Sequence, residues 1–313
     1  MGGLGKLRLH VEEASYLYGF CRSLPERIEV TRFLLRKKLA QARRVAGRSP
    51  VHPDAALALY GARHVVDLLG SEVYVLDEIF RERLYDRLPD FVPGAGAVVV
   101  DVGANVGMFS VLQARRGARV YAFEPNPDCY RRLCRTLVEN DLTGAVGAFN
   151  VAIGRRVGTG LLRVPDRRTA LGSVVAAGAA PAADSAVVGI TGLDLVLPAL
   201  GVERVDLLKV DAEGSEVEVL RGAARTLRCT KRVILEYHSG ELRDRVSSLL
   251  EAGGFRQVLH LDTPAPYLPE AGMIYAERGA AAGAGAADAA GSAAAPGGVS
   301  RRMTRAGTPP TIA

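Results

Sequence analysis

The spacing of apolar residues changes near residue 97. Before that point, apolar side chains recur at helical intervals within 1–48, which predicts a helix there. A second helix is expected over 53–69 and should end at Gly70. After residue 97, short continuous apolar runs alternate with amphipathic stretches, which is typical of buried strands alternating with helices.

This alternation predicts an α/β fold with a doubly wound, mostly parallel sheet. The last two strands should form an antiparallel hairpin at the edge of the sheet. Strands are expected at 98–102, 119–123, 145–151, 160–164, 186–191, 205–210, 232–236, 255–261 and 272–277. Helices are expected at 106–116, 127–140, 193–200 and 241–252, and another should begin at Ser215, which with Glu218 has the spacing of a capping box.

Three segments follow from this pattern: a basic helical extension over 1–70, an α/β domain over 71–279 and a tail over 280–313. The stretch 1–48 has 11 Lys and Arg residues against 4 Asp and Glu residues. In the tail, 16 of the 19 residues of 280–298 are Ala or Gly. Such a segment has too few large apolar side chains to offset its chain entropy, so we expect it to be disordered.

Charge and composition narrow the class of protein. The 313 residues carry a net charge of +6, but the positive excess belongs to the ends, so it says little about the partner of the central body. No apolar run reaches the roughly 18 residues of a membrane span, and no secretory signal pattern is present. The four cysteines show no CxxC spacing, which favours reduced thiols in a cytoplasmic protein.

The strongest chemical signal lies at the junction of the strand 98–102 and its helix. Asp101 ends the strand, and the loop after it contains Gly103, Asn105 and Gly107. Glycines let a ligand approach the backbone closely, and a helix N-terminus offers unpaired N–H groups. The spacing differs from the G-x-G-x-x-G run that binds a pyrophosphate. An acid before the loop suits a ligand with a cationic amine, such as S-adenosylmethionine.

Two further residues are expected to bind the same ligand. Glu124 closes the strand 119–123, where a carboxylate can accept both hydroxyls of a ribose. Asn126, followed by Pro127, should cap the next helix. The predicted cofactor-binding residues are therefore Asp101, Gly103, Asn105, Gly107, Glu124 and Asn126.

Four blocks of the sequence together resemble the FkbM-type S-adenosylmethionine-dependent methyltransferases: DVGANVG at 101–107, AFEP at 122–125, DLLKVDAEG at 206–214 and LEYH at 235–238. The resemblance implies a Rossmann-like class I methyltransferase fold and O-methylation of a small molecule, sugar or natural-product acceptor. The sequence departs from the pattern at Ala212, where a larger aliphatic residue is expected. It also departs around 171–173, in an insert expected to help define the acceptor pocket.

Candidate catalytic residues follow the later strands. His238 is the predicted general base, since imidazole titrates near neutral pH, and Asp211 is expected to orient it or bind the acceptor hydroxyl. Lys209, Glu213 and Glu236 are predicted to bind the substrate or to support these residues, although Lys209 could instead form a structural ion pair. The acids and His238 could together ligate a divalent cation, but without a close two-acid metal spacing no metal is predicted.

Three other functions compete with this one. The basic N-terminus suggests a nucleic-acid methyltransferase, but the block after residue 210 lacks the Asn/Asp-Pro-Pro-aromatic run that holds a flipped base. The glycine spacing disfavours a nicotinamide-dependent oxidoreductase. A non-catalytic nucleotide-binding module stays open. The expected partner is a small hydroxylated acceptor rather than a nucleic acid.

Overall fold

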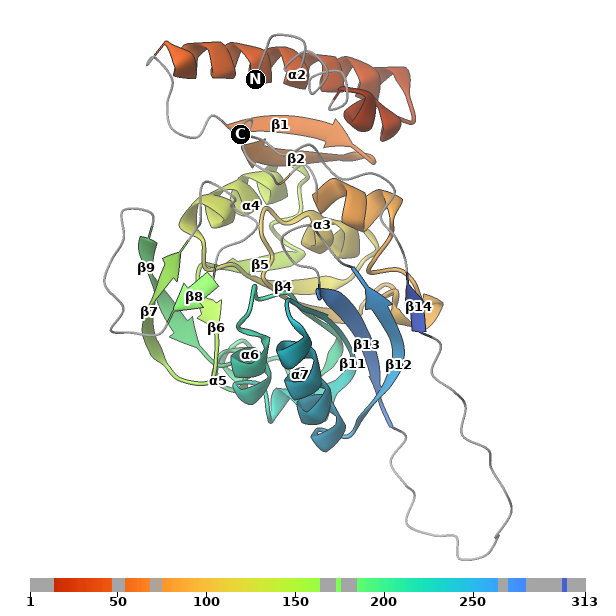
Figure 1. The fold of residues 1–313 in the computed structure, drawn as a ribbon, viewed down its shortest axis with the longest axis vertical. Coiled ribbons are helices and arrows are strands. Elements are labelled where there is room, and N and C mark those ends of the chain that lie inside the picture. Colours follow the sequence, from red (N-terminus) through yellow and green to blue (C-terminus); the bar gives the residue numbers. More distant parts are fainter. Residues whose placement is uncertain are drawn as a thin grey trace, which may run out of the picture.

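The computed structural model describes residues 14–46, 54–67, 72, 75–163, 173–175, 185–263, 270–279 and 300–302. An eight-stranded sheet runs through its centre in the order β14-β12-β13-β11-β10-β3-β4-β5 (Figure 1). Its strands are β3 (Val98–Val102), β4 (Arg119–Phe123), β5 (Val146–Phe149), β10 (Val205–Val210), β11 (Thr230–Tyr237), β12 (Phe255–Asp262), β13 (Gly272–Arg278) and β14 (Ser300–Arg302).

The sheet is parallel except for one strand. Neighbouring strands from β5 through β4, β3 and β10 to β11 all pair in parallel. β13 pairs antiparallel with both β11 and β12. The predicted α/β fold class is therefore confirmed, and so is the antiparallel pairing of 255–261 with 272–277. This hairpin lies at the end of the sheet as predicted, and the three-residue strand β14 adds to it by pairing in parallel with β12.

Helices cover both faces of the sheet. α3 (Met108–Arg115) and α4 (Pro127–Glu139) lie on one face, and α5 (Leu193–Ala199), α6 (Glu216–Arg221) and α7 (Gly240–Ala252) lie on the other (Figure 1). Val99 and Leu207 belong to the first core, whereas Val100 and Leu208 belong to the second. Successive strand residues thus pack into the cores on opposite faces of the sheet. Because both faces are buried, the strands are continuous apolar runs in the sequence. Short helical turns also lie at Asp77–Arg81, Pro89–Phe91 and Thr226–Cys229.

The N-terminal part holds one confirmed helix and one wrong prediction. The helix predicted in 1–48 is α2 (Leu24–Val45). The helix predicted over 53–69 is instead an antiparallel hairpin of β1 (Asp54–Leu59) and β2 (Ala62–Asp67). In β1 every second residue is buried, a period of two that the Ala- and Leu-rich composition concealed. Tyr60 and Gly61 both have positive φ in the two-residue turn, as a type I′ hairpin requires.

A small second sheet, ordered β6-β9-β7-β8, follows β5. It contains β6 (Ala152–Ile153), β7 (Gly158–Arg163), β8 (Ser173–Val175) and β9 (Ser185–Thr191). Two predicted strands, 160–164 and 186–191, fall within it. Most of the insert around 171–173 lies outside the described residues, so its expected role in acceptor selection is untested.

Two other expectations concern the ends and the surface. Within the predicted disordered tail, Ser300–Arg302 pairs in parallel with β12, and the remainder of 280–313 lies outside the described residues.

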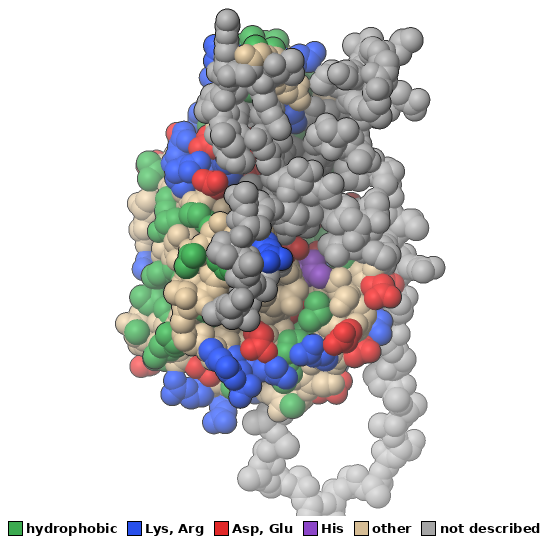
Figure 2. Space-filling model, turned by 60° about the vertical axis from the view of Figure 1, so that its left-hand side comes forward, with side chains coloured by type: hydrophobic (Ala, Val, Ile, Leu, Met, Phe, Trp, Pro, Cys, Tyr) green, Lys and Arg blue, Asp and Glu red, His purple; other side chains and the backbone are tan. Residues whose placement is uncertain are grey.

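Among the described helices, none combines the length and hydropathy needed to cross a membrane. Figure 2 shows Lys and Arg side chains interspersed with Asp and Glu side chains over the visible face of the described part.

Candidate active site

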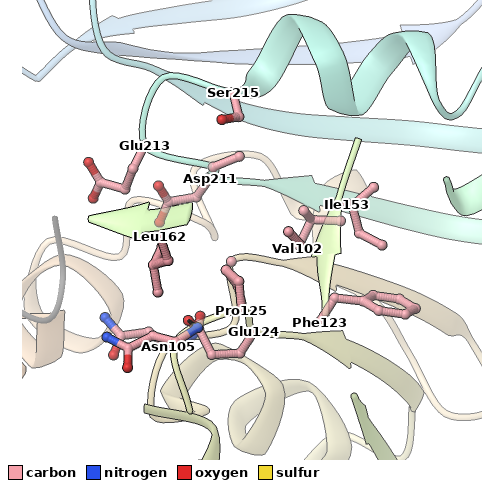
Figure 3. A pocket seen from close by; sticks show the side chains of 14 residues that line it. Val102, Asn105, Phe123, Glu124, Pro125, Ile153, Leu162, Asp211, Glu213 and Ser215 are labelled. Atoms are coloured by element: carbon pink, nitrogen blue, oxygen red, sulfur yellow. Dashed lines mark hydrogen bonds between the residues drawn. The ribbon is translucent and has the colours of Figure 1, made fainter. Parts of the chain in front are cut away.

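A pocket lies at the carboxyl ends of β3, β4 and β10 (Figure 3). The strand order reverses here, since the chain runs from β3 to β5 on one side and from β10 to β11 on the other. Ligands of open α/β sheets bind at such a point. Six predicted site residues line the pocket: Gly103, Asn105, Glu124, Asn126, Asp211 and Glu213. The structure adds wall residues that the sequence did not single out, among them Phe123, Pro125, Ile153, Leu162 and Ser215.

Packing within the protein excludes a side chain at both glycines of the first loop. Gly103 has φ +78°, and a Cβ there would lie 1.7 Å from the carbonyl oxygen of Asp211. Gly107 has φ +87°, and its Cβ would lie 2.3 Å from Leu133 Cδ1. Gly107 does not line the pocket. Close packing of β3 against β10 and of the loop against α4 therefore explains both glycines, and it leaves the Gly103 backbone at the pocket wall.

Asp101 and Lys209 form a buried pair behind the pocket wall. Lys209 Nζ lies 3.1 Å from Asp101 Oδ1 and 3.6 Å from Asp211 Oδ2, and it donates a 2.8 Å hydrogen bond to the Gly103 carbonyl. Burial alone would lower the pKa of Lys209, but Asp101 and Asp211 outweigh it and hold the pKa above its usual value. Asp101 also accepts a 2.6 Å hydrogen bond from Ser110 Oγ. Neither member of the pair lines the pocket, which supports the structural role of Lys209.

Glu124 is buried at the end of β4, and each of its carboxylate oxygens is oriented by a backbone N–H group. Oε2 accepts from Asn105 N at 2.7 Å, and Oε1 accepts from Asn126 N at 2.8 Å. Burial raises the pKa of Glu124 to about 7 against the effect of these two hydrogen bonds. A carboxylate oxygen has a second lone-pair direction, so both oxygens can still accept a ligand hydroxyl.

Asn126 has a structural role as well as a place in the pocket wall. Its Oδ1 accepts a 3.0 Å hydrogen bond from Asp128 N at the start of α4. The predicted helix cap is therefore confirmed. Its backbone N–H is the group that holds Glu124, so one residue fixes both the helix and the carboxylate.

His238, at the end of β11, is surrounded by carboxylates. Its Nδ1 lies 2.8 Å from Glu216 Oε1, and its Nε2 lies 3.3 Å from Glu213 Oε2 and 3.8 Å from Asp211 Oδ1. Burial alone would lower the pKa of His238, but Glu216, Glu213 and Glu236 raise it to about 10. Without a bound cation, these carboxylates favour the protonated ring, so His238 must lose a proton before Nε2 can act as a general base or bind a metal ion.

Carboxylates crowd the space around His238. Of this group Asp211 and Glu213 line the pocket, whereas Glu236 and His238 do not. Burial, followed by Asp211, raises the pKa of Glu213 to about 9 and that of Glu236 to about 8. Tyr85 donates a 3.4 Å hydrogen bond to Glu236 Oε2. One ligand atom from each of Asp211, Glu213 and His238 lies within 4.8 Å of the others, an arrangement that could hold a metal ion. Figure 3 shows the Asp211 and Glu213 carboxylates on the same side of the pocket.

Glu216 is the main site residue that sequence reasoning missed. The predicted capping box of Ser215 and Glu218 is wrong, because the Ser215 side chain makes no capping hydrogen bond. Instead Glu216 is buried, and its Oε1 accepts from both Gly214 N and His238 Nδ1. Its place directly after the 206–214 block was the available signal.

Comparison with known proteins finds one matching family model and several similar proteins. The family model "Methyltransferase FkbM domain" matches residues 101–257. "Methyltransferase sdnD" of Sordaria araneosa is 32% identical over 215 residues, covering 58% of this chain and 81% of that protein. "Hexuronic acid methyltransferase AglP" of Haloferax volcanii is 29% identical over 204 residues, covering 65% and 80%. "31-O-demethyl-FK506 methyltransferase FkbM" of Streptomyces tacrolimicus is 28% identical over 226 residues, covering 62% and 85%.

Proposed function

The chain belongs to the FkbM methyltransferase family, and from this premise we propose that it transfers the methyl group of S-adenosylmethionine to a hydroxyl of a small acceptor. The observation that carries the proposal is the state of Glu124, whose two oxygens are held in place by Asn105 N and Asn126 N at the edge of a pocket. Such a preorganised carboxylate suits the paired hydroxyls of a ribose.

The rest of the pocket is compatible with this ligand. Phe123, Ile153 and Leu162 give it an apolar wall beside Glu124, suited to a flat base. The backbone of Gly103 and Asn105, just before α3, faces the same space. Asp101 has no exposed surface, so its proposed contribution is to hold this loop through Ser110 and Lys209 rather than to touch the ligand.

Asp211 is the residue we assign to the acceptor hydroxyl. When bound, S-adenosylmethionine supplies an electrophilic methyl group. The sulfonium sulfur keeps the electron pair of the sulfur–methyl bond that breaks. The acceptor oxygen gains that carbon and must lose its proton. Asp211 lines the pocket with its side chain 25% exposed, and its Oδ2 lies 3.6 Å from the ammonium group of Lys209. It can accept the hydrogen bond and the proton of the hydroxyl, while the enzyme mainly positions the two reactants.

The acceptor class rests on two relatives and on the sequence after residue 210. One relative is named for a hexuronic acid and one for a 31-O-demethyl compound, and both names support a hydroxylated small molecule. The block after residue 210 also lacks the Asn/Asp-Pro-Pro-aromatic run that holds a flipped base.

A screen with methyl-labelled S-adenosylmethionine tests the proposal. Uronic acids, other sugars and hydroxylated natural products serve as acceptors, and we expect the labelled methyl group to appear as a methyl ether of at least one of them. Asp211→Asn should lower kcat by about 10²–10⁴-fold. Binding of S-adenosylmethionine without transfer to any acceptor would favour a nucleotide-binding module, and no binding at all would end the proposal.

A further inference from the structure

The geometry points to a divalent-cation site formed by His238 and by Asp211 and Glu213, the two of the three that line the pocket; its place in catalysis, though not its existence, rests on the proposed function. Such a cation would face the space that the acceptor enters, because Asp211 and Glu213 both line the pocket. We assign it the task of binding the acceptor hydroxyl and making that hydroxyl more acidic.

The distances suit a small divalent ion. An octahedral ion with bonds of about 2.1 Å places neighbouring ligand atoms about 3 Å apart. His238 Nε2 lies 3.3 Å from Glu213 Oε2 and 3.8 Å from Asp211 Oδ1. Small side-chain movements would close these gaps. Two carboxylates and one imidazole would leave the remaining coordination positions for water and an acceptor oxygen.

His238 is oriented as a metal ligand usually is. Its Nδ1 is held at 2.8 Å by Glu216 Oε1, which turns Nε2 toward Asp211 and Glu213. In histidines that bind metals, the other ring N–H almost always donates a hydrogen bond to a carboxylate or carbonyl oxygen. This bond fixes the ring orientation and the tautomer. Glu216 is completely buried and is itself anchored by Gly214 N at 2.9 Å. The support for the ring is therefore built into the fold.

The surroundings are short of positive charge. Four carboxylates, from Asp211, Glu213, Glu216 and Glu236, lie around His238, whereas Lys209 is the other cation that the described structure brings to them. Glu216 Oε2 is buried without a hydrogen-bond partner among the described residues. Buried carboxylates are costly unless they are paired. A proton on His238 supplies one positive charge at this place, and a divalent cation supplies two.

Direct cation binding tests the inference without relying on turnover. The full chain is treated with a chelator, dialysed and titrated with Mn²⁺ alone, with the paramagnetic signal of unbound Mn²⁺ as the readout. We expect one Mn²⁺ per chain. Glu213→Gln and His238→Gln should each weaken binding at least tenfold, and Glu216→Gln should weaken it about tenfold through the ring orientation. Glu218→Gln, on the exposed side of the same helix, is the matched control and should bind as the wild type does.

The outcomes separate this inference from the proposed function. S-adenosylmethionine binding is measured by calorimetry on the same chelator-treated samples, and circular dichroism checks that each variant is folded. If S-adenosylmethionine binds but Mn²⁺ does not saturate the chain, the cation site is wrong and the methyltransferase proposal stands. The cation site is equally wrong if Glu213→Gln binds Mn²⁺ as tightly as Glu218→Gln. If S-adenosylmethionine fails to bind, the proposed function fails whatever Mn²⁺ does.

Discussion

At the scale of single residues, Glu124 makes ligand binding sensitive to pH. Burial raises its pKa to about 7, although backbone N–H groups and Lys209 oppose the shift. A ribose hydroxyl donates best to the ionised carboxylate, which is depleted below pH 7. If only that form binds, the affinity for S-adenosylmethionine falls about tenfold from pH 8 to pH 6. Calorimetry at several pH values checks this.

The matched control for this pH dependence is Glu124→Gln. The amide keeps the shape of the side chain but does not titrate, so its affinity should be lower and nearly constant over the same range. Glu213, Glu236 and His238 also titrate near the pocket. A profile in the variant that keeps the wild-type slope would assign the pH dependence to one of them.

Gly103 should be intolerant of any side chain. A Cβ would overlap the Asp211 carbonyl oxygen, and the positive φ adds backbone strain. We expect Gly103→Ala to destabilise the fold by roughly 3 kcal/mol or more, measured by denaturant unfolding. Gly144→Ala is the control, since nothing lies within 4 Å of the Cβ it would add. Equal stability of the two variants would contradict the close packing of β3 against β10.

Sequence reasoning placed residues well where their position was local. Glu124 and Asp211 follow strands, so their location at the carboxyl edge needed only the strand pattern. Sequence reasoning did not predict which of the site residues reach the pocket and which are buried behind its wall. Asp101 and Lys209 lie behind the wall because β3 and β10 pair with these two residues opposite each other, a register that no local pattern encodes. The raised pKa of His238 depends on its hydrogen bond with Glu216, whose burial was not anticipated.

At the scale of elements, the hairpin β1–β2 shows why propensity misled. Ala and Leu favour helix, but pairing with β2 and packing against α2 and α4 override that preference. The hairpin is tied to α4 by Arg132, which is completely buried. Its guanidinium reaches Asp54 at 2.8 Å, Glu72 at 2.9 Å and Asp67 at 3.5 Å.

Arg132→Ala should therefore be strongly destabilising. Removing the cation leaves three carboxylates without their shared partner, a change that typically costs about 3–5 kcal/mol. The neighbouring Arg131 is 50% exposed and also approaches Asp54. Because exposed ion pairs contribute about 0–1 kcal/mol, Arg131→Ala should change stability little. Chemical unfolding of both variants gives the comparison, and equal losses would show that Arg132 does not organise this contact.

At the scale of the whole molecule, the N-terminal elements share a core with the sheet. Phe33 of α2 and Leu57 of β1 belong to the same buried cluster as Val99 of β3 and Val120 of β4. This core therefore contains residues from both sides of the predicted boundary at residue 70. Removing 1–70 should lower the melting temperature by more than roughly 10 °C or prevent folding.

The opposite truncation provides the contrast. Removing 280–313 takes away β14, a strand of three residues at the edge of the sheet, among the described elements. The melting temperature should then stay within a few degrees of the full chain, because little described apolar surface is lost. A fall as large as that from removing 1–70 would show that the tail belongs to the folded body.

The most direct test of the central claim is a calorimetric titration of S-adenosylmethionine into the full chain and into Glu124→Ala. The pocket at the ends of β3, β4 and β10 predicts one binding site per chain. Losing hydrogen bonds to a buried charged group costs about 1.5–3 kcal/mol, so Glu124→Ala should bind ten- to a hundredfold more weakly. Absence of binding to the wild-type chain, or equal affinity of the two proteins, would contradict the assignment of this pocket.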